Sequence, residues 1–373
     1  MRDATLNGVF LCVSILGARV IATSTIGSAF TGRDNRLTLL RLVLATAVMV
    51  EHIFIVPRGI EGGPVAAIHG WSIGYAAVSG FFILSGFLIA GSLEHRGKLT
   101  SYAASRALRI LPALLVLAIS STFLVGPFVT TASMPEYWTS AQTWLYPVNV
   151  MLFMDTSQGP LGVFGNNPAP GEFSATLWTL RYEVLAYIGA AILFFSGIAR
   201  GWKAHLVLLV AATAGYLAIG AYWPDSPAII TLTLRLGAAF LLGMLIYSAR
   251  NKIPLLPVAA VLALPAWYFL GSSPFAEIFL NLALASILFW LAFAKLGRLP
   301  TFSGMADWSY GIYIWHYPVM QTLWYFDLAR SPLGLLLWSV PITFLISALS
   351  WSLVEKPVLS YKSRLGHWLR RDQ

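Results

Sequence analysis

Apolar runs of about twenty residues recur along most of this chain, and short polar breaks separate them. An α-helix needs about twenty mainly apolar residues to cross roughly 30 Å of hydrocarbon, and it satisfies its own backbone hydrogen bonds. The pattern therefore predicts an all-α, polytopic transmembrane helix bundle of about ten spans, near residues 37–56, 71–92, 110–130, 177–198, 205–222, 228–248, 254–271, 275–294, 305–326 and 333–354.

The composition agrees with a lipid environment. Of the 373 residues, 58% are hydrophobic and only 10% are charged, whereas soluble domains carry about 25% charged residues. The formal net charge of +9 does not indicate nucleic-acid binding, because the basic residues are scattered among apolar runs rather than gathered on one surface. The single cysteine, Cys12, excludes an intrachain disulfide, a thiolate zinc site and an iron–sulfur cluster.

The charge of the loops tests the number of spans independently. If the first span runs from the inside to the outside, the outer segments hold only Arg58 and Arg330. The longest outer loop, residues 131–176, contains no lysine or arginine. Cytoplasmic loops of membrane proteins carry an excess of these residues. Both ends of the helical core are therefore predicted to be cytoplasmic.

The chain divides into three predicted parts. Residues 1–32 form an N-terminal apolar extension, of which 6–30 are apolar enough to span but carry Arg19 near the middle. An extra helix, an uncleaved signal-like segment and a misassigned start all remain open for this part. Residues 33–361 form the membrane domain, and residues 362–373 form a basic cytoplasmic tail.

Ionisable residues inside the predicted spans are the first candidates for chemistry, because each costs about 2.5–3.5 kcal/mol at a helix centre. Arg41 and His52 are eleven residues apart, which places them on one helix face about 16 Å apart. Arg41 would hold an anionic donor near the cytoplasm, and His52 would act as a base further out. For Arg235, Glu277 and Asp307, an interhelical ion pair is the favoured interpretation.

A second basic group follows the second predicted span. Arg106 and Arg109 are three residues apart, so they lie on the same side of a continuing helix. Together with Arg96 and Lys98 they form a compact cytoplasmic basic patch. An arginine pair of this kind suits a phosphate-bearing ligand. The alternative is the ordinary excess of basic residues on the cytoplasmic side.

Several segments, taken together and in this order, resemble one known family. The ten residues between Arg41 and His52 match the spacing in its first-helix motif. Other matches are Gly80–Ile89, Arg106–Pro112, Leu177–Glu183 with Tyr187, Ser309–His316 with Pro318, and Val354–Pro357. The chain thus resembles the acyltransferase 3 family, which comprises integral membrane O-acyltransferases of bacterial surface glycans. The resemblance runs from about residue 33 to 361 and indicates the single-domain type. Glu51 and the apolar N-terminal segment depart from the family pattern.

This resemblance implies a multi-pass enzyme of the bacterial cytoplasmic (inner) membrane. It would transfer an acyl group, most simply acetyl, from cytoplasmic acyl-CoA to a sugar hydroxyl of a surface glycan or lipid-linked oligosaccharide. The predicted acyl-CoA-binding residues are Arg41, Arg106 and Arg109, and the predicted catalytic residues are His52 and Glu183. His52 would be the general base, and a transient acyl-histidine remains open as the competing mechanism. Acyl-CoA is a co-substrate, and no bound cofactor is expected.

Glu183 is the predicted partner of His52, because it lies near the outer end of its helix at a depth comparable to that of His52. Glu51 is a poorer candidate, because it is adjacent to His52 on the helix and points about 100° away. Arg181 is expected to pair with Glu183 rather than to support an oxyanion. His316 is equally consistent with a hydrogen-bonded core residue and with a functional one. Ser85 fits close helix packing better than a nucleophile. The remaining substrate-contacting or structural candidates are Trp178 and Tyr310.

A different class of protein also fits the buried charges. A secondary transporter or flippase for an anionic or glycan substrate would place Arg, Glu and His within its spans. Transporters often show two corresponding halves interrupted by glycine and proline, and no such symmetry is visible in this sequence. No histidine spacing typical of a metal site occurs, so no metal is expected. The expected partners are acyl-CoA, a glycan and membrane lipid, without nucleic acid.

Overall fold

The structure is a computed structural model of the chain, and it describes residues 24–30, 35–59, 67–297, 300, 302 and 304–360. Within these ranges the fold is helical apart from a two-stranded antiparallel hairpin, β1 (Ala67–Ile68) and β2 (Trp71–Ser72). The helices are α2 (Ile26–Ala29), α3 (Leu37–Ile55), α4 (Ile73–Arg96), α5 (Leu99–Ile119), α6 (Gly126–Val129), α7 (Met134–Thr139), α8 (Ala141–Met151), α9 (Trp178–Phe195), α10 (Trp202–Tyr222), α11 (Ala228–Ser248), α12 (Val258–Leu270), α13 (Ala276–Phe293), α14 (Ser309–Tyr325) and α15 (Pro332–Ser350).

The helix bundle predicted from the apolar runs is confirmed, since each of the ten runs overlaps one helix. Eight helical segments in the described part of the chain are long and apolar enough to cross a membrane. The two shorter ones are α12, with 13 residues, and α14, with 17. One boundary was wrong: the third span begins at Leu99 rather than at residue 110. Arg106 and Arg109 therefore lie inside α5, where their side chains reach the interior of the bundle.

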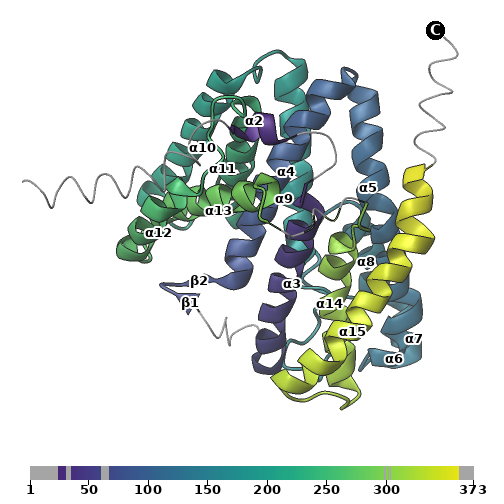
Figure 1. Cartoon of the computed structure of the whole chain (residues 1–373). Coiled ribbons are helices and arrows are strands. Elements are labelled where there is room, and N and C mark those ends of the chain that lie inside the picture. The colour runs from purple at the N-terminus through teal and green to yellow at the C-terminus, as the bar shows by residue number, and fades with distance from the viewer. Residues whose placement is uncertain are drawn as a thin grey trace, which may run out of the picture.

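The bundle divides into groups of neighbouring helices (Figure 1). Helix α14 packs against α3, α5 and α15, and α4 packs against α3 and α11. Hairpins α10–α11 and α12–α13 lie on the opposite side of the bundle from α15. Almost every side chain of α14 is buried, although the helix carries a histidine, a glutamine and several tyrosines. A polar helix surrounded by other helices is a place where membrane proteins build functional sites.

Glycines allow α4 and α11 to approach closely. A Cβ atom on Gly86 would lie 1.9 Å from the backbone oxygen of Phe240, and one on Gly243 would lie 2.0 Å from that of Ile83. No larger side chain fits at either position. Close packing was expected at Ser85, but Gly86 makes the close approach, whereas Ser85 Oγ donates to Glu183 at 3.4 Å.

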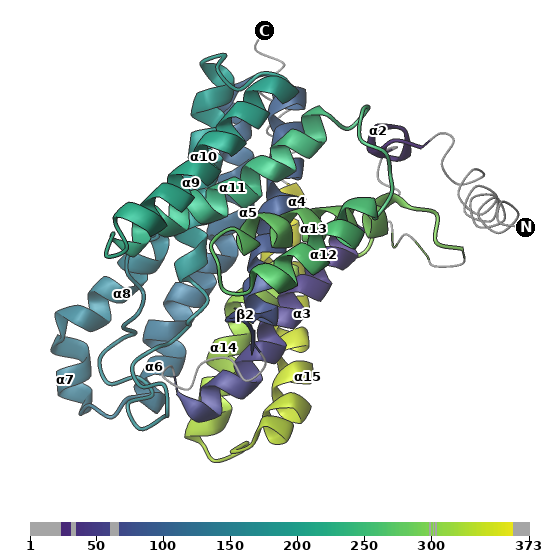
Figure 2. The same cartoon turned by 90° about the vertical axis from the view of Figure 1, so that its left-hand side faces the viewer.

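The long outer loop has structure of its own (Figure 2). Helix α5 continues through a π-helical segment, Ser120–Val125, into α6, and α7 and α8 follow. The aromatic stretch Tyr137–Tyr146 lies within these two short helices and the break between them. The Gly/Pro/Asn-rich run 159–171 is a loop, as its composition predicts. It folds back onto the bundle and contributes to the site described below.

The two predicted terminal parts are only slightly represented. Of the N-terminal extension, residues 24–30 are described, and α2 lies against the loop that joins α11 to α12. The backbone nitrogen of Ile26 donates to the oxygen of Ile253 at 3.0 Å, and that of Leu255 donates to Ser24 at 3.0 Å. Residues 1–23 and the tail, 362–373, lie outside the described residues.

Candidate active site

Two histidines from different helices meet near the outer side of the bundle. His52 lies in the last turn of α3, and His316 lies near the middle of α14. The Nε2 atom of His316 is 3.1 Å from Nδ1 of His52, and the ring centroids are 5.1 Å apart. His52 therefore points at α14 rather than at lipid. His316, for which two interpretations were open, is fully buried and contacts His52 directly.

The hydrogen-bond partners assign the tautomer of each ring. Nδ1 of His316 lies 2.8 Å from the carbonyl oxygen of Ile312, which can only accept, so this nitrogen carries the proton. In the neutral ring Nε2 of His316 then accepts. Nδ1 of His52 faces that acceptor and the carbonyl oxygen of Val48, at 2.9 Å, so it carries a proton as well. The lone pair of His52 is thus on Nε2, which has no hydrogen-bond partner within the described ranges.

The outer loop supplies a carboxylate beside this pair. The ring of Tyr317 lies edge-on to His52, with centroids 5.3 Å apart, and its hydroxyl donates to Oε2 of Glu172 at 3.1 Å. Gln321, one turn further along α14, fixes the loop by donating to the backbone oxygens of Ala169, at 2.7 Å, and Glu172, at 3.2 Å. The loop thereby places Glu172 next to the helix that carries His316.

Burial of Glu172 raises its pKa above the usual range, and the Tyr317 hydrogen bond offsets part of that rise. A carboxyl group with a raised folded-state pKa stabilises the fold below its unfolded pKa, and this contribution is lost as the pH rises through the folded value. At neutral pH the ionised group is thus unfavourable. We expect Glu172→Gln, which keeps an acceptor for Tyr317, to raise Tm at about pH 7 and to have less effect at about pH 4. Thermal unfolding at both pH values checks this, and an equal Tm change at both would contradict it.

The expected pairing of Glu183 with His52 is wrong. Glu183 accepts hydrogen bonds from Ser85 Oγ, at 3.4 Å, and from the Tyr187 hydroxyl. Helix α14 lies between His52 and α9, and its Tyr313 is bonded to Thr179 of α9. Glu183 therefore faces α4, while His52 faces α14.

Two neighbouring expectations have opposite outcomes. Arg181 does not pair with Glu183, because residues two apart on a helix point away from each other. Its Nε donates instead to the backbone oxygen of Phe153, at 2.7 Å. The prediction that Glu51 does not orient His52 is confirmed: Glu51 accepts from Ser72 Oγ at 2.9 Å and from the backbone N–H of Gly74 at the start of α4.

A four-charge cluster joins Arg41 of α3 and Arg109 of α5 to two carboxylates. Asp307 lies just before α14, and Glu355 ends the π-helical segment Trp351–Glu355 that follows α15. Asp307 accepts from Nη1 of Arg41, at 3.0 Å, and from Nη2 of Arg109, at 2.6 Å. Nη1 of Arg109 also donates to Glu355 at 2.8 Å. The ion-pair interpretation of Asp307 is confirmed, as is that of Arg235 with Glu277, whose Nε and Oε1 atoms are 3.3 Å apart. Two of the three arginines expected at the donor thus already have carboxylate partners.

A cavity of about 430 Å³ opens beside this cluster, and we call it the inner cavity. Its polar lining comes from α3, α4, α5, α9 and α14: Arg41, Ser85, Ser92, His95, Arg96, Arg106, Arg109, Glu183, Tyr187 and Tyr310. Within the described residues, Arg96 and Arg106 have no carboxylate partner. Nε of Arg96 donates to Ser92 Oγ at 3.0 Å, and Nε of Arg106 donates to Ser105 Oγ at 3.2 Å. The inner cavity is therefore suited to an anionic ligand.

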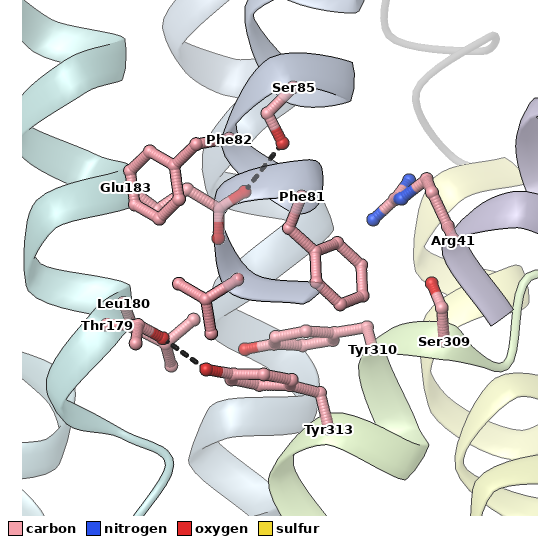
Figure 3. Close-up of a pocket in the computed structure, with 11 residues that line it drawn as sticks. Arg41, Phe81, Phe82, Ser85, Thr179, Leu180, Glu183, Ser309, Tyr310 and Tyr313 are labelled. Carbon is pink, nitrogen blue, oxygen red and sulfur yellow. Dashed lines mark hydrogen bonds between the residues drawn. The ribbon is translucent and has the colours of Figure 1, made fainter. Parts of the chain in front are cut away.

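A narrow void of about 40 Å³ adjoins the inner cavity, and Figure 3 shows side chains that line it. Both spaces are lined by Arg41, Ser85, Glu183 and Tyr310. The rings of Phe81 and Tyr313, with centroids 5.8 Å apart, line the void, and the Tyr313 ring lies 6.4 Å from that of His316. The inner cavity and the void together extend from the basic cluster to Tyr313, whose ring neighbours His316, and His52 itself lines neither space.

The other candidate residues lie at the edges of this arrangement. Tyr310 lines both spaces and donates to the backbone oxygen of Ile110 at 3.0 Å. Trp178 is 43% exposed and stacks edge-on with Tyr182, so it lies at the surface. No group of three residues able to hold a metal ion occurs in the part of the chain that the structure describes.

Sequence reasoning missed Glu172 and Tyr317. Tyr317 follows His316 directly, yet nothing in the sequence marks its hydroxyl as a loop contact. Glu172 lies in a loop far from both histidines in sequence, and only the folding of that loop onto α14 brings it near. Glu355 lies in the segment Val354–Pro357, which resembles a family motif, but the sequence does not indicate its ion pair with Arg109.

Comparison with known proteins agrees with this geometry. A family model described as an acyltransferase domain, of the acyltransferase 3 type, matches residues 34–355. An O-acetyl transferase of Shigella phage Sf6 is 28% identical over 344 residues, covering 89% of this chain and 98% of that protein. Nodulation protein 10 of Rhizobium leguminosarum bv. viciae is 28% identical and covers 90% and 95%.

The exopolysaccharide production protein ExoZ of Rhizobium meliloti is 27% identical, covering 78% of this chain and 91% of that protein. No solved structure matches the chain. The family model spans most of the sequence. The chain therefore belongs to the acyltransferase 3 family and is a membrane-bound O-acyltransferase.

Proposed function

We propose that this protein transfers an acyl group, most simply acetyl, from cytoplasmic acyl-CoA to a sugar hydroxyl of a surface or lipid-linked glycan. The observation that carries the proposal is Nε2 of His52, which has no hydrogen-bond partner among the described residues and whose ring contacts His316. His316 neighbours Tyr313, which lines the void that adjoins the basic inner cavity. The names of the relatives from Shigella phage Sf6 and Rhizobium meliloti support an O-acetyl group and a polysaccharide. The bacterial inner membrane is the proposed location.

The donor would enter from the cytoplasmic side. Arg96 and Arg106 line the inner cavity and have no carboxylate partner among the described residues, so they are the better phosphate ligands. Arg109 would contribute less, because Asp307 and Glu355 occupy its donors. The acyl-pantetheine arm would extend between Phe81 and Tyr313, whose rings must separate to admit it.

The reaction would then proceed at His52. Nε2 of His52 accepts the proton of the sugar hydroxyl, and the sugar oxygen forms a bond to the thioester carbonyl carbon. The carbon–sulfur bond breaks, and the coenzyme A thiolate takes the proton from the imidazolium. His316 accepts from Nδ1–H of His52 throughout and so holds the ring in the tautomer that leaves Nε2 free.

The proposal is tested with purified protein in nanodiscs, labelled acetyl-CoA and a bacterial surface glycan. Transfer of label to the glycan is the expected result. Label that enters neither glycan nor protein would reject the proposed donor, whereas label that stays on the protein without acceptor would indicate an acyl-histidine intermediate. The transporter alternative predicts movement of glycan across the membrane without any transfer of label.

Arg106→Ala is expected to raise KM for acyl-CoA by about tenfold or more and to lower kcat less, because a phosphate contact contributes mainly ground-state binding. Steady-state kinetics with varied acyl-CoA checks the prediction. Lys203→Ala, which removes a cation from another predicted inner loop, is the matched control and should leave KM unchanged. A KM for Arg106→Ala equal to that of the control would remove Arg106 from the donor site.

A further inference from the structure

An apolar groove opens from the inner cavity toward the bilayer between α5 and α9, and we call it the side groove. Its volume is about 370 Å³. Arg106, Ile110 and Tyr187 line both the side groove and the inner cavity. The rest of its lining is almost wholly apolar and includes Ala103, Ala107, Leu111, Val184, Ile188 and Ile192. Ile188 and Ile192 are 51% and 63% exposed, so the side groove faces the membrane.

The direction of the side groove matches that of a lipid chain. It follows α5 from Leu99 to Leu111, which is about 18 Å at 1.5 Å per residue. Leu99 begins the helix at the predicted cytoplasmic side, and Arg106 lies about 10 Å further along α5, part-way down the groove. A phospholipid whose phosphate reached Arg106 would place its acyl chain in the deeper part of the groove, beside Ile110 and Leu111.

The positive charge of Arg106, where the side groove joins the inner cavity, favours an anionic ligand. The guanidinium of Arg106 lies at the junction of the two spaces, with its Cζ 5.8 Å from the centroid of the Tyr187 ring. No carboxylate pairs with it in the described part of the chain, in contrast to Arg109 three residues later. An apolar groove with an arginine in its lining, at the point where it joins the inner cavity, suits a chain attached to a phosphate.

We propose that the side groove binds one acyl chain of an anionic inner-leaflet phospholipid, whose phosphate pairs with Arg106. The lipid phosphate would then occupy the position that the donor phosphates require. Anionic lipid and acyl-CoA would therefore compete for Arg106, and this second step rests on the proposed function.

The acyl group of the donor is a poorer occupant. The path proposed for the donor passes through the void that adjoins the inner cavity, which is lined by residues of α3, α4, α9 and α14 and includes Phe81 and Tyr313. The side groove lies between α5 and α9 and leads to lipid instead. His52, Phe81 and Tyr313 do not line the side groove, so a donor acyl group that lay in it would be away from the proposed path.

The test compares two adjacent substitutions on α5. Ala103→Phe fills the side groove, whereas Ala104→Phe adds the same ring at an exposed position that does not line it. Each protein is reconstituted with phosphatidylglycerol and phosphatidylcholine, extracted, and examined by native mass spectrometry. Wild type and Ala104→Phe are expected to retain phosphatidylglycerol, and Ala103→Phe to lose it. Equal retention by the two variants would overturn the proposal.

Arg106→Ala gives a second measurement that does not depend on filling the groove. It is expected to remove the preference for phosphatidylglycerol over phosphatidylcholine, and an unchanged preference would contradict the assignment of the phosphate to Arg106. For the competition, KM for acetyl-CoA should rise severalfold with phosphatidylglycerol in Ala104→Phe and stay flat in Ala103→Phe. Identical lipid dependence would reject competition. Absence of any acyl transfer would reject the proposed function, while lipid retention would still decide the lipid site.

Discussion

Replacing His52 with alanine is expected to lower kcat for acyl transfer by about 10²–10⁴-fold, the range that a positioned general base contributes. The expectation depends on one nitrogen. His316 and the Val48 carbonyl hold the Nδ1 proton of His52, so Nε2 is left as the acceptor of a proton. Labelled acetyl transfer by the purified variant, measured at saturating acceptor, checks the value. KM for acyl-CoA should change little, because His52 does not line the inner cavity.

The matched control is His205→Ala. His205 is a buried histidine of α10, and its Nδ1 lies 3.0 Å from Ser248 Oγ, on the far side of the bundle from α14. Loss of this ring should leave kcat within about twofold of wild type. If both variants transferred acetyl at the wild-type rate, His52 would have no part in the chemistry, and its Nε2 atom would not be the proton acceptor.

The helix bundle could be predicted because lipid imposes simple rules on length and polarity. Every predicted span overlaps a helix, and even α12 and α14, which are short, were recognised from their apolar runs. The start of α5 was missed because residues 99–109 are too polar to read as membrane. Gly97 ends α4 in a left-handed conformation, and α5 begins at Leu99. Arg106 and Arg109 line the inner cavity instead of facing lipid, so α5 accommodates them.

Some members of the candidate site could be predicted from the sequence, whereas the contacts between helices could not. Arg41 and His52 were found from spacing, since one helix fixes their relation. Partners of His52 come from another helix, and helix order in space is not written in the sequence. Depth alone suggested Glu183, yet α14 lies between the two, and His316 is the actual neighbour. Long-range contacts such as Glu172 with Tyr317 depend on how a loop folds back, which no local pattern encodes.

Replacing Asp307 with asparagine is expected to destabilise the protein by about 3–5 kcal/mol, the effect of breaking a buried ion pair from one side. Asp307 and Glu355 balance Arg41 and Arg109, so the cluster has no net charge. The substitution leaves two guanidinium groups with one carboxylate in a largely buried environment. Thermal unfolding in detergent should show a marked fall in Tm, and donor binding should weaken as Arg41 and Arg109 lose their fixed positions beside the inner cavity.

Asp327→Asn is the control that separates burial from charge. Asp327 also pairs with an arginine, Arg330, but its side chain is 73% exposed. Exposed pairs contribute only about 0–1 kcal/mol, so this variant should unfold within a few degrees of wild type. A similar Tm for both variants would mean that Asp307 does not neutralise the two arginines. Arg41 and Arg109 would then be available to the donor phosphates, and Arg106 would no longer be a better phosphate ligand than they are.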